Sequence, residues 1–476
     1  MFTPISEIPE IRKALGESFR KGVPRPLEWR KHQLLQLARM LQEHCEAFAK
    51  AIEKDIGKPK LEMYSHELGT GIARSIASAQ ALEDWNRPVV VDAPDWQKPW
   101  EPTVYRAAKG TVVIIAFVHA RPLGTTLFFG LVQPLIGAIA AGCCAILKPS
   151  EISPHIAELL AELCPKYLDP RAYRVVHGGI PETTAVLKLP WDHIFYTGNN
   201  KVARIIAREA ANHLTPLTLE LGGKSPVIVD PKYDLKLAAK RILWAKALNC
   251  GQNCIAPDYV LIPRTNQDEF VEALKSAYTE LFPDGSMQSD SISRIVSTQH
   301  YTRLMGLLNG TQGQVVLGGR SDGQIKIELT VIKDVGPYDC LLDSEIFGPL
   351  LPIVPVGSID EAIEFVCARA HPLALYAFTE NPKVKQQILE ETASGAAVFN
   401  DCFMQQAVDG VPFGGVGDSG YGRQCGKASF DTFSYERASI DVPKEMEPFY
   451  AARYQPYDEH KLRLLGAALT APIPNN

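Results

Sequence analysis

Residues 110–148 read GTVVIIAFVHARPLGTTLFFGLVQPLIGAIAAGCCAILK, and this stretch decides the fold. Residues 112–118 and 143–147 near its two ends are short apolar runs, as expected of buried strands. The part between them includes no charged residue from position 123 onward. Strands of parallel sheets are covered on both faces and are apolar throughout. The stretch therefore predicts a strand, a buried helix and a second strand of one parallel sheet.

The uncharged run 123–147 is also long enough to cross a bilayer. Gln133-Pro134 interrupts it, and β-rich apolar segments flank it, so we favour a buried helix. Near the C-terminus the apolar piece 464–470 is too short to span a membrane, although it leaves weak surface association open. We expect no membrane span.

Apolar segments and helical patterns alternate along the rest of the chain. Further strands are expected at 174–177, 193–196, 226–230, 259–262, 350–356 and 395–400, and helices at 27–56, 153–167, 201–213 and 267–281. This alternation is typical of βαβ units and predicts an α/β fold in two halves, with the reactive centre between them. Residues 88–102, rich in proline and tryptophan, are predicted to form an extended connection.

Length and composition limit the functional classes. The 476 residues are 46% apolar with a formal net charge of −5, which indicates two or three folded domains. Forty-nine basic against 54 acidic residues give no basic excess, so we expect no nucleic-acid partner. The ten cysteines form no CxxC pair and the histidines no HExxH motif, so no metal site is expected. Free thiols and an N-terminus without a signal-like pattern predict a cytoplasmic protein.

Two motifs carry candidate chemistry. Residues 249–257, NCGQNCIAP, place Cys254 among small and polar residues, where a substrate has room to approach the thiol. From this composition alone Cys254 is either a nucleophile or a core residue. Residues 217–226, LTLELGGKSP, place Glu220 in an apolar strand, where desolvation raises a carboxyl pKa toward the range of a general base. The alternative is a carboxylate satisfied by backbone amides of the following turn.

Together with these motifs, several stretches resemble the aldehyde dehydrogenase superfamily, and most closely its class 3 branch of fatty and aromatic aldehyde dehydrogenases. They are GAIAAG (137–142), LKPSE (147–151), HLTP (213–216), EIFGP (345–349), PLALY (372–376) and PFGGVG (412–417). The resemblance covers about residues 27–443. It implies two Rossmann-type α/β domains with a small β oligomerisation arm, and a homodimer.

The resemblance also implies a domain organisation. Residues 1–87 and 103–211 correspond to a dinucleotide-binding domain, and residues 212–400 to a catalytic domain. Residues 88–102 and 401–445 correspond to the oligomerisation arm and bridging segments, followed by a C-terminal tail at 446–476.

The resemblance assigns roles residue by residue. Cys254 matches the nucleophile that forms a thiohemiacetal and then a thioester, and Glu220 matches the general base. Cys250 matches a non-catalytic position. The positions expected to bind NAD or NADP are Lys148, Glu151, Gly198, Asn199, Lys201, Leu221, Glu345 and Phe347. For Lys148 and Glu151 the alternative is a helix-capping salt bridge.

Three departures from the family pattern stand out. The asparagine that donates to the oxyanion is missing or replaced, because His119 stands at its position, or Ala120 when the following proline is aligned. His119 is a candidate catalytic residue that substitutes as this donor or carries a proton, and the alternative is a displaced loop residue. The cofactor turn Gly-Ser-Thr-x-x-Gly appears as GNNKVA at 198–203. There Lys201 either brings positive charge near the phosphates or fills their space. Gln405 and Cys425 stand where histidine is expected, which suggests an altered substrate pocket.

The resemblance, with Cys254, Glu220, Lys148 and Glu345 retained, implies an enzyme that oxidises an apolar, aliphatic or aromatic aldehyde to its carboxylic acid with NAD or NADP. The alternative is a related protein adapted to cofactor-independent isomerisation or cyclisation of a carbonyl compound, or one that is catalytically impaired. Damage at both the oxyanion segment and the cofactor turn motivates this alternative.

Overall fold

The computed structural model describes residues 2–116, 128–466 and 472–474. Two compact units are present, and each is described by itself. Unit 1 comprises Met1–Trp85 and Ala108–Ser434, and unit 2 comprises Asn86–Ala107 and Tyr435–Asn476.

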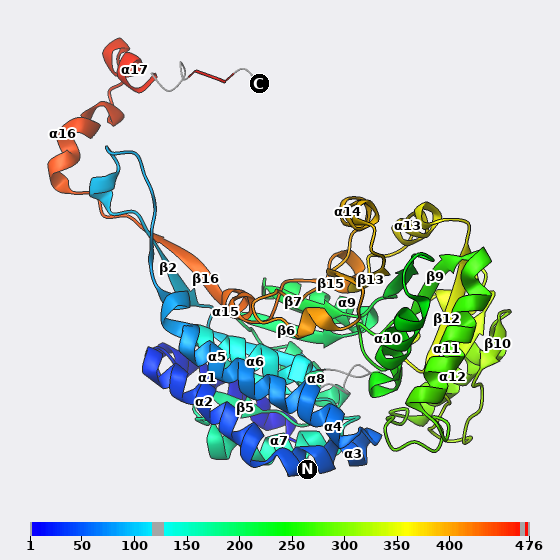
Figure 1. Cartoon of the computed structure of the whole chain (residues 1–476). Coiled ribbons are helices and arrows are strands. Elements are labelled where there is room, and N and C mark those ends of the chain that lie inside the picture. The colour runs from blue at the N-terminus through cyan, green and yellow to red at the C-terminus, as the bar shows by residue number, and fades with distance from the viewer. Residues whose placement is uncertain (1, 117–127, 467–471, 475–476) are drawn as a thin grey trace. The chain divides into compact units, whose positions relative to one another are not determined.

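Unit 1 contains a first sheet with the strand order β15-β7-β6-β3-β4-β5 (Figure 1). Its strands are β3 (Thr111–Ala116), β4 (Cys144–Lys148), β5 (Tyr173–Val175), β6 (His193–Gly198), β7 (Leu217–Leu221) and β15 (Gly420–Tyr421). All neighbours pair in parallel except β15, which is antiparallel to β7. The parallel sheet predicted from residues 110–148 is therefore confirmed. The predicted boundary after residue 211 falls before β7, the last parallel strand of this sheet.

From residue 128, where the described part of the uncharged stretch begins, the chain forms η4 (Phe128–Val132) and the helix α6 (Gln133–Ala141), followed by β4. Every residue of α6 is buried, and the helix ends at Gly142, whose φ of 86° suits glycine. Gly137 lets α6 approach α15 (Lys427–Phe433), because a Cβ at this position would lie 2.7 Å from that of Ser429. The prediction of a buried helix is confirmed. None of the helices in the described ranges has the length and apolarity that a bilayer crossing requires.

Further helices surround the first sheet. They are α1 (Ile8–Arg20), α2 (Leu27–Glu43), α3 (Cys45–Ile56), α5 (Gly69–Asn86), α7 (Pro154–Tyr167), α8 (Ile180–Leu187) and α9 (Asn200–Ala211). The helical pattern at 27–56 is two helices, α2 and α3, which meet at His44, because the backbone of His44 leaves the helical region. Between α3 and α5 the chain forms α4 (Lys60–Glu62) and η2 (Met63–Leu68), a turn of π-helix.

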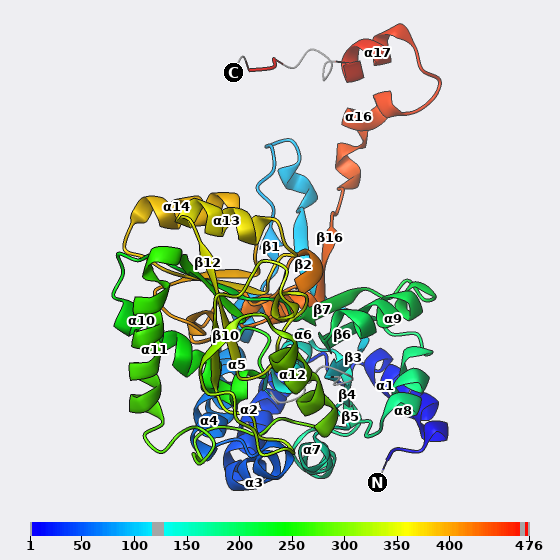
Figure 2. The same cartoon turned by 90° about the vertical axis from the view of Figure 1, so that its right-hand side faces the viewer.

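A second sheet in unit 1 has the order β10-β11-β12-β9-β8-β13-β14. Its strands are β8 (Pro226–Val229), β9 (Tyr259–Pro263), β10 (Gln314–Leu317), β11 (Thr330–Lys333), β12 (Leu350–Val356), β13 (Ala374–Phe378) and β14 (Ala396–Phe399). The associated helices are α10 (Leu235–Ala247), α11 (Gln267–Leu281), α12 (Thr298–Gly310), α13 (Ile359–Cys367) and α14 (Pro382–Glu391). Figure 2 shows α13 and α14 side by side, and α10 beside α11. The second predicted α/β half is thus present.

Unit 2 contains a three-stranded sheet in the order β1-β2-β16, formed by β1 (Val89–Val90), β2 (Thr103–Ala108) and β16 (Ser434–Ser439). Within this unit the Trp100 indole donates to the Tyr450 hydroxyl at 2.6 Å. Two short helices follow, α16 (Glu447–Tyr450) and α17 (Glu459–Leu465).

Candidate active site

Glu220 and Cys254 line the same small cavity of about 10 Å³, close to the space of one water molecule. The two residues are 34 positions apart and come from different halves of unit 1: Glu220 from β7 of the first sheet, and Cys254 from the loop between α10 and β9. The other lining residues are Thr197, Leu221, Gln252, Asn253, Phe347, Leu373, Phe413 and Gln424. The structure therefore brings the predicted nucleophile and the predicted base to the same cavity.

Glu220 is held inside the sheet by its position in β7. It lies opposite Thr197 of β6 on one side and Gly420 of β15 on the other. The side chain is 3% exposed, and neither carboxyl oxygen has a hydrogen-bond partner among the described residues. Burial raises the Glu220 pKa well above its usual range, with the charge of Arg423 opposing this. A raised pKa makes the carboxylate, once ionised, a stronger base toward a proton donor in the cavity.

Cys254 lies on a loop with an unusual backbone. After α10 ends, Asn249, Cys250 and Gly251 have φ values of 52°, 55° and 69°, all in the left-handed region. The half-buried thiol of Cys254 donates to Asn253 Oδ1 at 3.7 Å. Burial, followed by the negative charges of Glu345 and Glu220, raises the pKa of the Cys254 thiol. The resting thiol is therefore protonated and needs a base to become nucleophilic.

Gln252 anchors this loop from within the core. Its Nε2 donates to the carbonyls of Asn249 at 3.1 Å and Arg294 at 2.9 Å, and its Oε1 accepts from the Val296 amide at 3.0 Å. The Gln252 side chain is fully buried, so these bonds also satisfy its polar atoms. Sequence reasoning did not single out Gln252, because a glutamine has no distinctive chemistry from which its role could be read.

The segment with Glu345 and Phe347 is clamped by residues that sequence reasoning also missed. His300 Nε2 donates to the Phe347 carbonyl at 2.6 Å. The backbone of Phe347 is in the left-handed region, with a φ of 50°. Arg303 donates to the Ile346 carbonyl, and Asp258 Oδ2 accepts from the Ile346 amide at 2.9 Å. These polar contacts join positions far apart in sequence, so no local pattern indicates them.

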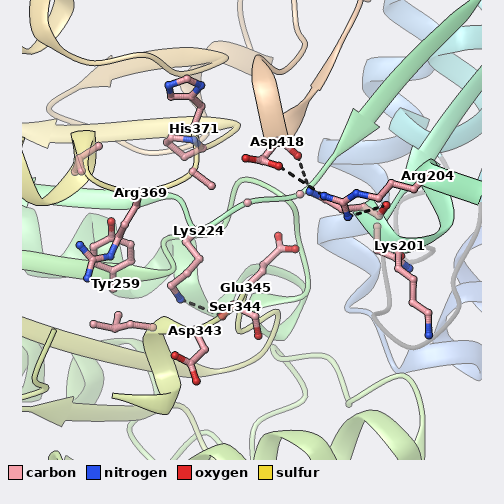
Figure 3. A pocket seen from close by; sticks show the side chains of 18 residues that line it. Lys201, Arg204, Lys224, Tyr259, Asp343, Ser344, Glu345, Arg369, His371 and Asp418 are labelled. Atoms are coloured by element: carbon pink, nitrogen blue, oxygen red, sulfur yellow. Dashed lines mark hydrogen bonds and ion pairs between the residues drawn. The ribbon is translucent and has the colours of Figure 1, made fainter. Parts of the chain in front are cut away.

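Figure 3 shows a second, larger cavity of about 560 Å³. Its lining residues Gly222 and Pro372 are adjacent in sequence to Leu221 and Leu373, which line the first cavity. The larger cavity is lined by three of the predicted cofactor-binding residues, Asn199, Lys201 and Glu345. Figure 3 shows Lys201 and Arg204 on one side of the cavity and Arg369 and His371 on the other, with Glu345 between them. The remaining lining residues are Asn200, Gly222, Gly223, Lys224, Tyr259, Leu342, Asp343, Ser344, Val366, Ala370, Pro372 and Asp418.

Three predicted cofactor residues lie at the same edge of the first sheet. Lys148, Gly198 and Leu221 are the last residues of the parallel strands β4, β6 and β7. Dinucleotides bind in doubly wound folds outside the carboxyl ends of the strands. The edge that these residues form is therefore the one where such a ligand is expected.

Lys148 is completely buried at the end of β4. Its Nζ donates to the Pro149 carbonyl at 2.8 Å. Burial lowers the pKa of Lys148 to about 8, and the nearby charges of Glu151 and Glu182 oppose this. A buried ammonium is costly unless it is well paired, so this lysine fits a position that a ligand completes.

The cofactor turn is occupied by its own polar contacts. Asn199 caps α9, because its Oδ1 accepts from the Val202 amide at 3.0 Å. The Asn199 amide donates to the Tyr196 hydroxyl at 3.1 Å. Lys201 is exposed and faces the large cavity, so its charge is accessible to an anionic ligand there.

The structure places the remaining candidates as follows. Gln405 is buried and donates to the Tyr376 hydroxyl at 3.3 Å, which in turn donates to the Ile255 carbonyl at 2.6 Å. Cys425 is buried, and its sulfur accepts from Arg74 Nη1 at 2.9 Å. Cys250 is buried in the core, and burial raises its pKa to about 12. His119 and Ala120 lie outside the described residues.

Comparisons with known proteins show the family of the chain. Residues 7–438 match the aldehyde dehydrogenase family. The chain is 42% identical over 460 residues to mouse (Mus musculus) aldehyde dehydrogenase family 3 member A2, covering 94% of this chain and 91% of that one. It is 40% identical over 461 residues to a rat (Rattus norvegicus) protein named aldehyde dehydrogenase, dimeric NADP-preferring, covering 95% and 98%.

A solved structure gives the same result for the fold. The substrate-bound state of Staphylococcus aureus AldH superposes with a TM-score of 0.92 at 36% identity, covering 97% of this chain and 99% of that one. The resemblance found in the sequence motifs is therefore confirmed along nearly the full length: the chain belongs to the aldehyde dehydrogenase family.

Proposed function

We propose that this protein oxidises an apolar aldehyde to the carboxylic acid with NAD or NADP, using Cys254 as the nucleophile and Glu220 as the general base. The observation that carries this proposal is the shared cavity of the two side chains. The raised pKa of Glu220 suits a group that takes a proton from a thiol or from water near neutral pH.

The covalent steps follow from these two groups. Glu220 accepts the Cys254 thiol proton, and Sγ forms a bond to the aldehyde carbon, giving a thiohemiacetal. NAD or NADP, when bound, would accept the hydride that leaves this carbon, so that a thioester remains on Cys254. Glu220 releases the thiol proton to solvent and then takes a proton from water, whose oxygen attacks the thioester carbon. The C–S bond breaks and the acid leaves, and Glu220 returns this second proton to the Cys254 thiolate, which restores the thiol.

The residues present fit a dinucleotide. Both Gly222 and Glu345 line the 560 Å³ cavity, and a Cβ on residue 222 would lie 2.2 Å from Glu345 Oε2, so the carboxylate keeps its position in the cavity because residue 222 has no side chain. Glu345 and Asn199 would hold the polar groups of the ligand there, and Lys148 the groups at the β4 end. The rat relative is named NADP-preferring, which supports this class of cofactor.

An apolar cavity supports the choice of substrate. It has a volume of about 230 Å³, and most of its lining is apolar: Pro59, Leu61, Trp244, Ala247, Leu248, Leu281 and Phe282, with Glu62, Ser65, His66 and Ser291. A neighbouring cavity shares Glu62, His66 and Leu248 with it. That neighbour also shares Asn253 with the cavity of Cys254. An apolar aldehyde tail in the 230 Å³ cavity would therefore lead, through the neighbouring cavity, toward the Cys254 thiol.

We also propose a homodimer in a reducing, cytoplasmic environment. The word dimeric in the rat relative's name and the exposed apolar side chains of Val89, Val90 and Tyr435 in the sheet of unit 2 support the dimer. All ten cysteines, each within the described ranges, are free thiols, which supports the environment. Light scattering after size exclusion, for the wild type and for Val90→Glu, measures the oligomeric state.

The test of function is direct. The purified protein is incubated with NAD+ or NADP+ and a panel of aliphatic, aromatic and anionic aldehydes, and absorbance of the reduced cofactor is followed. We expect turnover with apolar aldehydes that Cys254→Ala abolishes. No signal with any pair, together with no cofactor binding by calorimetry, would overturn the proposal in favour of cofactor-independent carbonyl chemistry.

A further inference from the structure

The loop that carries Cys254 needs support from outside itself. Asn249 and Cys250 both lie in the left-handed region, which is costly for most L-residues, as for Cys250, and less so for asparagine. Gly251 cannot be replaced there, because a Cβ would lie 2.3 Å from the Gly348 carbonyl oxygen. Such a backbone persists only where surrounding contacts hold it.

Glu62 supplies one of these contacts at the start of the loop. Its Oε2 accepts from the Asn249 amide at 3.0 Å. Asn249 is 2% exposed and follows the last helical residues of α10, so its amide lies beyond the regular bonding of the helix. A buried amide of this kind must find an acceptor elsewhere, and here the acceptor is a side chain 187 positions earlier in the chain.

The position of Glu62 is itself well defined. It ends α4, immediately before the π-helical turn η2, a form that often marks functional sites. On this turn Glu67 makes a buried ion pair with Lys58 at 2.6 Å, with side chains 3% and 4% exposed. Lys58 also places positive charge near Glu62. The segment 58–67 is therefore a fixed platform rather than a free surface loop.

We propose that Glu62 is a positioning residue, which sets the left-handed backbone at Asn249 and thereby the place of the Cys254 thiol. Glu62 also lines the apolar cavity and its neighbour, so the clamp lies where the aldehyde tail would pass. The inference rests on the proposed nucleophilic role of Cys254. The oxygen of residue 62 that accepts the hydrogen bond from the Asn249 amide is required for this role, whereas the negative charge of Glu62 is not.

Three variants test the clamp. Glu62→Gln keeps an oxygen that can accept from the Asn249 amide, Glu62→Asp withdraws the carboxylate by one methylene, and Glu62→Ala removes it. The readouts are kcat and KM, the rate at which iodoacetamide alkylates Cys254 without cofactor, and hydrogen–deuterium exchange of peptides covering residues 248–254.

We expect Glu62→Gln to stay within about twofold of the wild type in every readout. Glu62→Ala should lower kcat and the alkylation rate about tenfold, leave KM for the cofactor unchanged and speed exchange at 248–254, with Glu62→Asp between the two. If Glu62→Ala does not fold, Glu62→Asp against Glu62→Gln decides. Equal loss in Glu62→Gln and Glu62→Ala would overturn the proposal, as would unchanged exchange in Glu62→Asp and Glu62→Ala.

Glu46→Gln is the matched control, because Glu46 bonds Lys60 and Tyr64 beside the same segment and does not reach the loop. It should leave all readouts unchanged. Exchange at 248–254 reports on the clamp even in a protein that turns over no aldehyde. A failure of the clamp is therefore distinguishable from a failure of the proposed function.

Discussion

Gly222 and Glu345 are in such close approach that a Cβ on residue 222 would lie 2.2 Å from Glu345 Oε2. Gly222 follows β7 directly, and Glu345 precedes β12 by five residues, so the pair connects the segments beside the two sheets of unit 1. Both residues line the 560 Å³ cavity. The absence of a side chain at position 222 is therefore a condition for the position of the carboxylate.

Gly222→Ala should displace Glu345 and weaken binding of NAD or NADP about tenfold, because the new methyl group occupies the place of the carboxylate. Calorimetric titration with each cofactor measures this. Gly306→Ala, where a Cβ meets open space, is the control and should leave binding unchanged. Unchanged affinity in Gly222→Ala would mean that Glu345 does not contribute to the cofactor site.

Glu220→Gln should raise thermal stability, and the gain should grow with pH. The Glu220 pKa is raised in the folded protein, so above the unfolded value the folded state binds more protons than the unfolded state. Between the unfolded and the folded pKa of Glu220, the free energy of unfolding of the wild type therefore falls as pH rises. A neutral glutamine does not lose stability in this way. Melting curves from pH 5 to pH 9 check this, with the exposed Glu269→Gln as the control.

The same variant should trap an intermediate. Without the base, thioester hydrolysis slows about 10²–10⁴-fold, the usual contribution of a general base. Mass spectrometry after mixing with cofactor and aldehyde should then show acyl-enzyme on Cys254. Wild-type turnover should rise with pH as Glu220 ionises. Rapid deacylation in Glu220→Gln would assign the base to another group.

Lys148→Met should increase stability while weakening cofactor binding. Because the Lys148 pKa falls from 10.5 to about 8 on folding, the unfolded state binds more protons between these values. The free energy of unfolding of the wild type therefore increases as pH rises from about 8 to 10.5. Below pH 8 the full cost of burying the charged lysine, roughly 3 kcal/mol, destabilises the fold. The advantage of Lys148→Met in melting temperature should be largest at pH 7 and shrink by pH 10. Lys166→Met, at an exposed lysine paired with Glu162, should show no such trend.

Lys201→Glu should weaken cofactor binding more than Lys201→Ala, by about tenfold against threefold at low salt. The Lys201 ammonium faces the cavity at the start of α9 and is exposed to solvent. Salt screens exposed charges, so the difference in affinity between the two variants should shrink at about 0.5 M salt. Fluorescence titration measures both affinities, with Lys188→Glu as a charge-matched control outside the cavity. Tighter binding by Lys201→Ala would show that the side chain fills the space of the phosphates.

Local sequence patterns were enough to predict much of the fold. The apolar run at 110–148 predicted β3, α6 and β4, because segments that are buried on both faces are apolar at nearly every position. The helix at 267–281 and the strand at 350–356 were predicted with the bounds that α11 and β12 have in the structure. The patterns did not show the break at His44, since apolar spacing continues across it and the change is confined to the backbone torsions of that one residue.

The sequence by itself determined the family and the two candidate reactive groups, because short motifs around Glu220 and Cys254 carry enough information to be recognised without a structure. Only the tertiary structure decided that these side chains line one cavity. It also decided that the Glu345 carboxylate lies where a side chain on residue 222 would be, and that Glu62 accepts a hydrogen bond from the Asn249 amide. The reason is physical. Composition and periodicity record what each segment buries, whereas these contacts join residues tens to hundreds of positions apart and exist only once the two sheets pack.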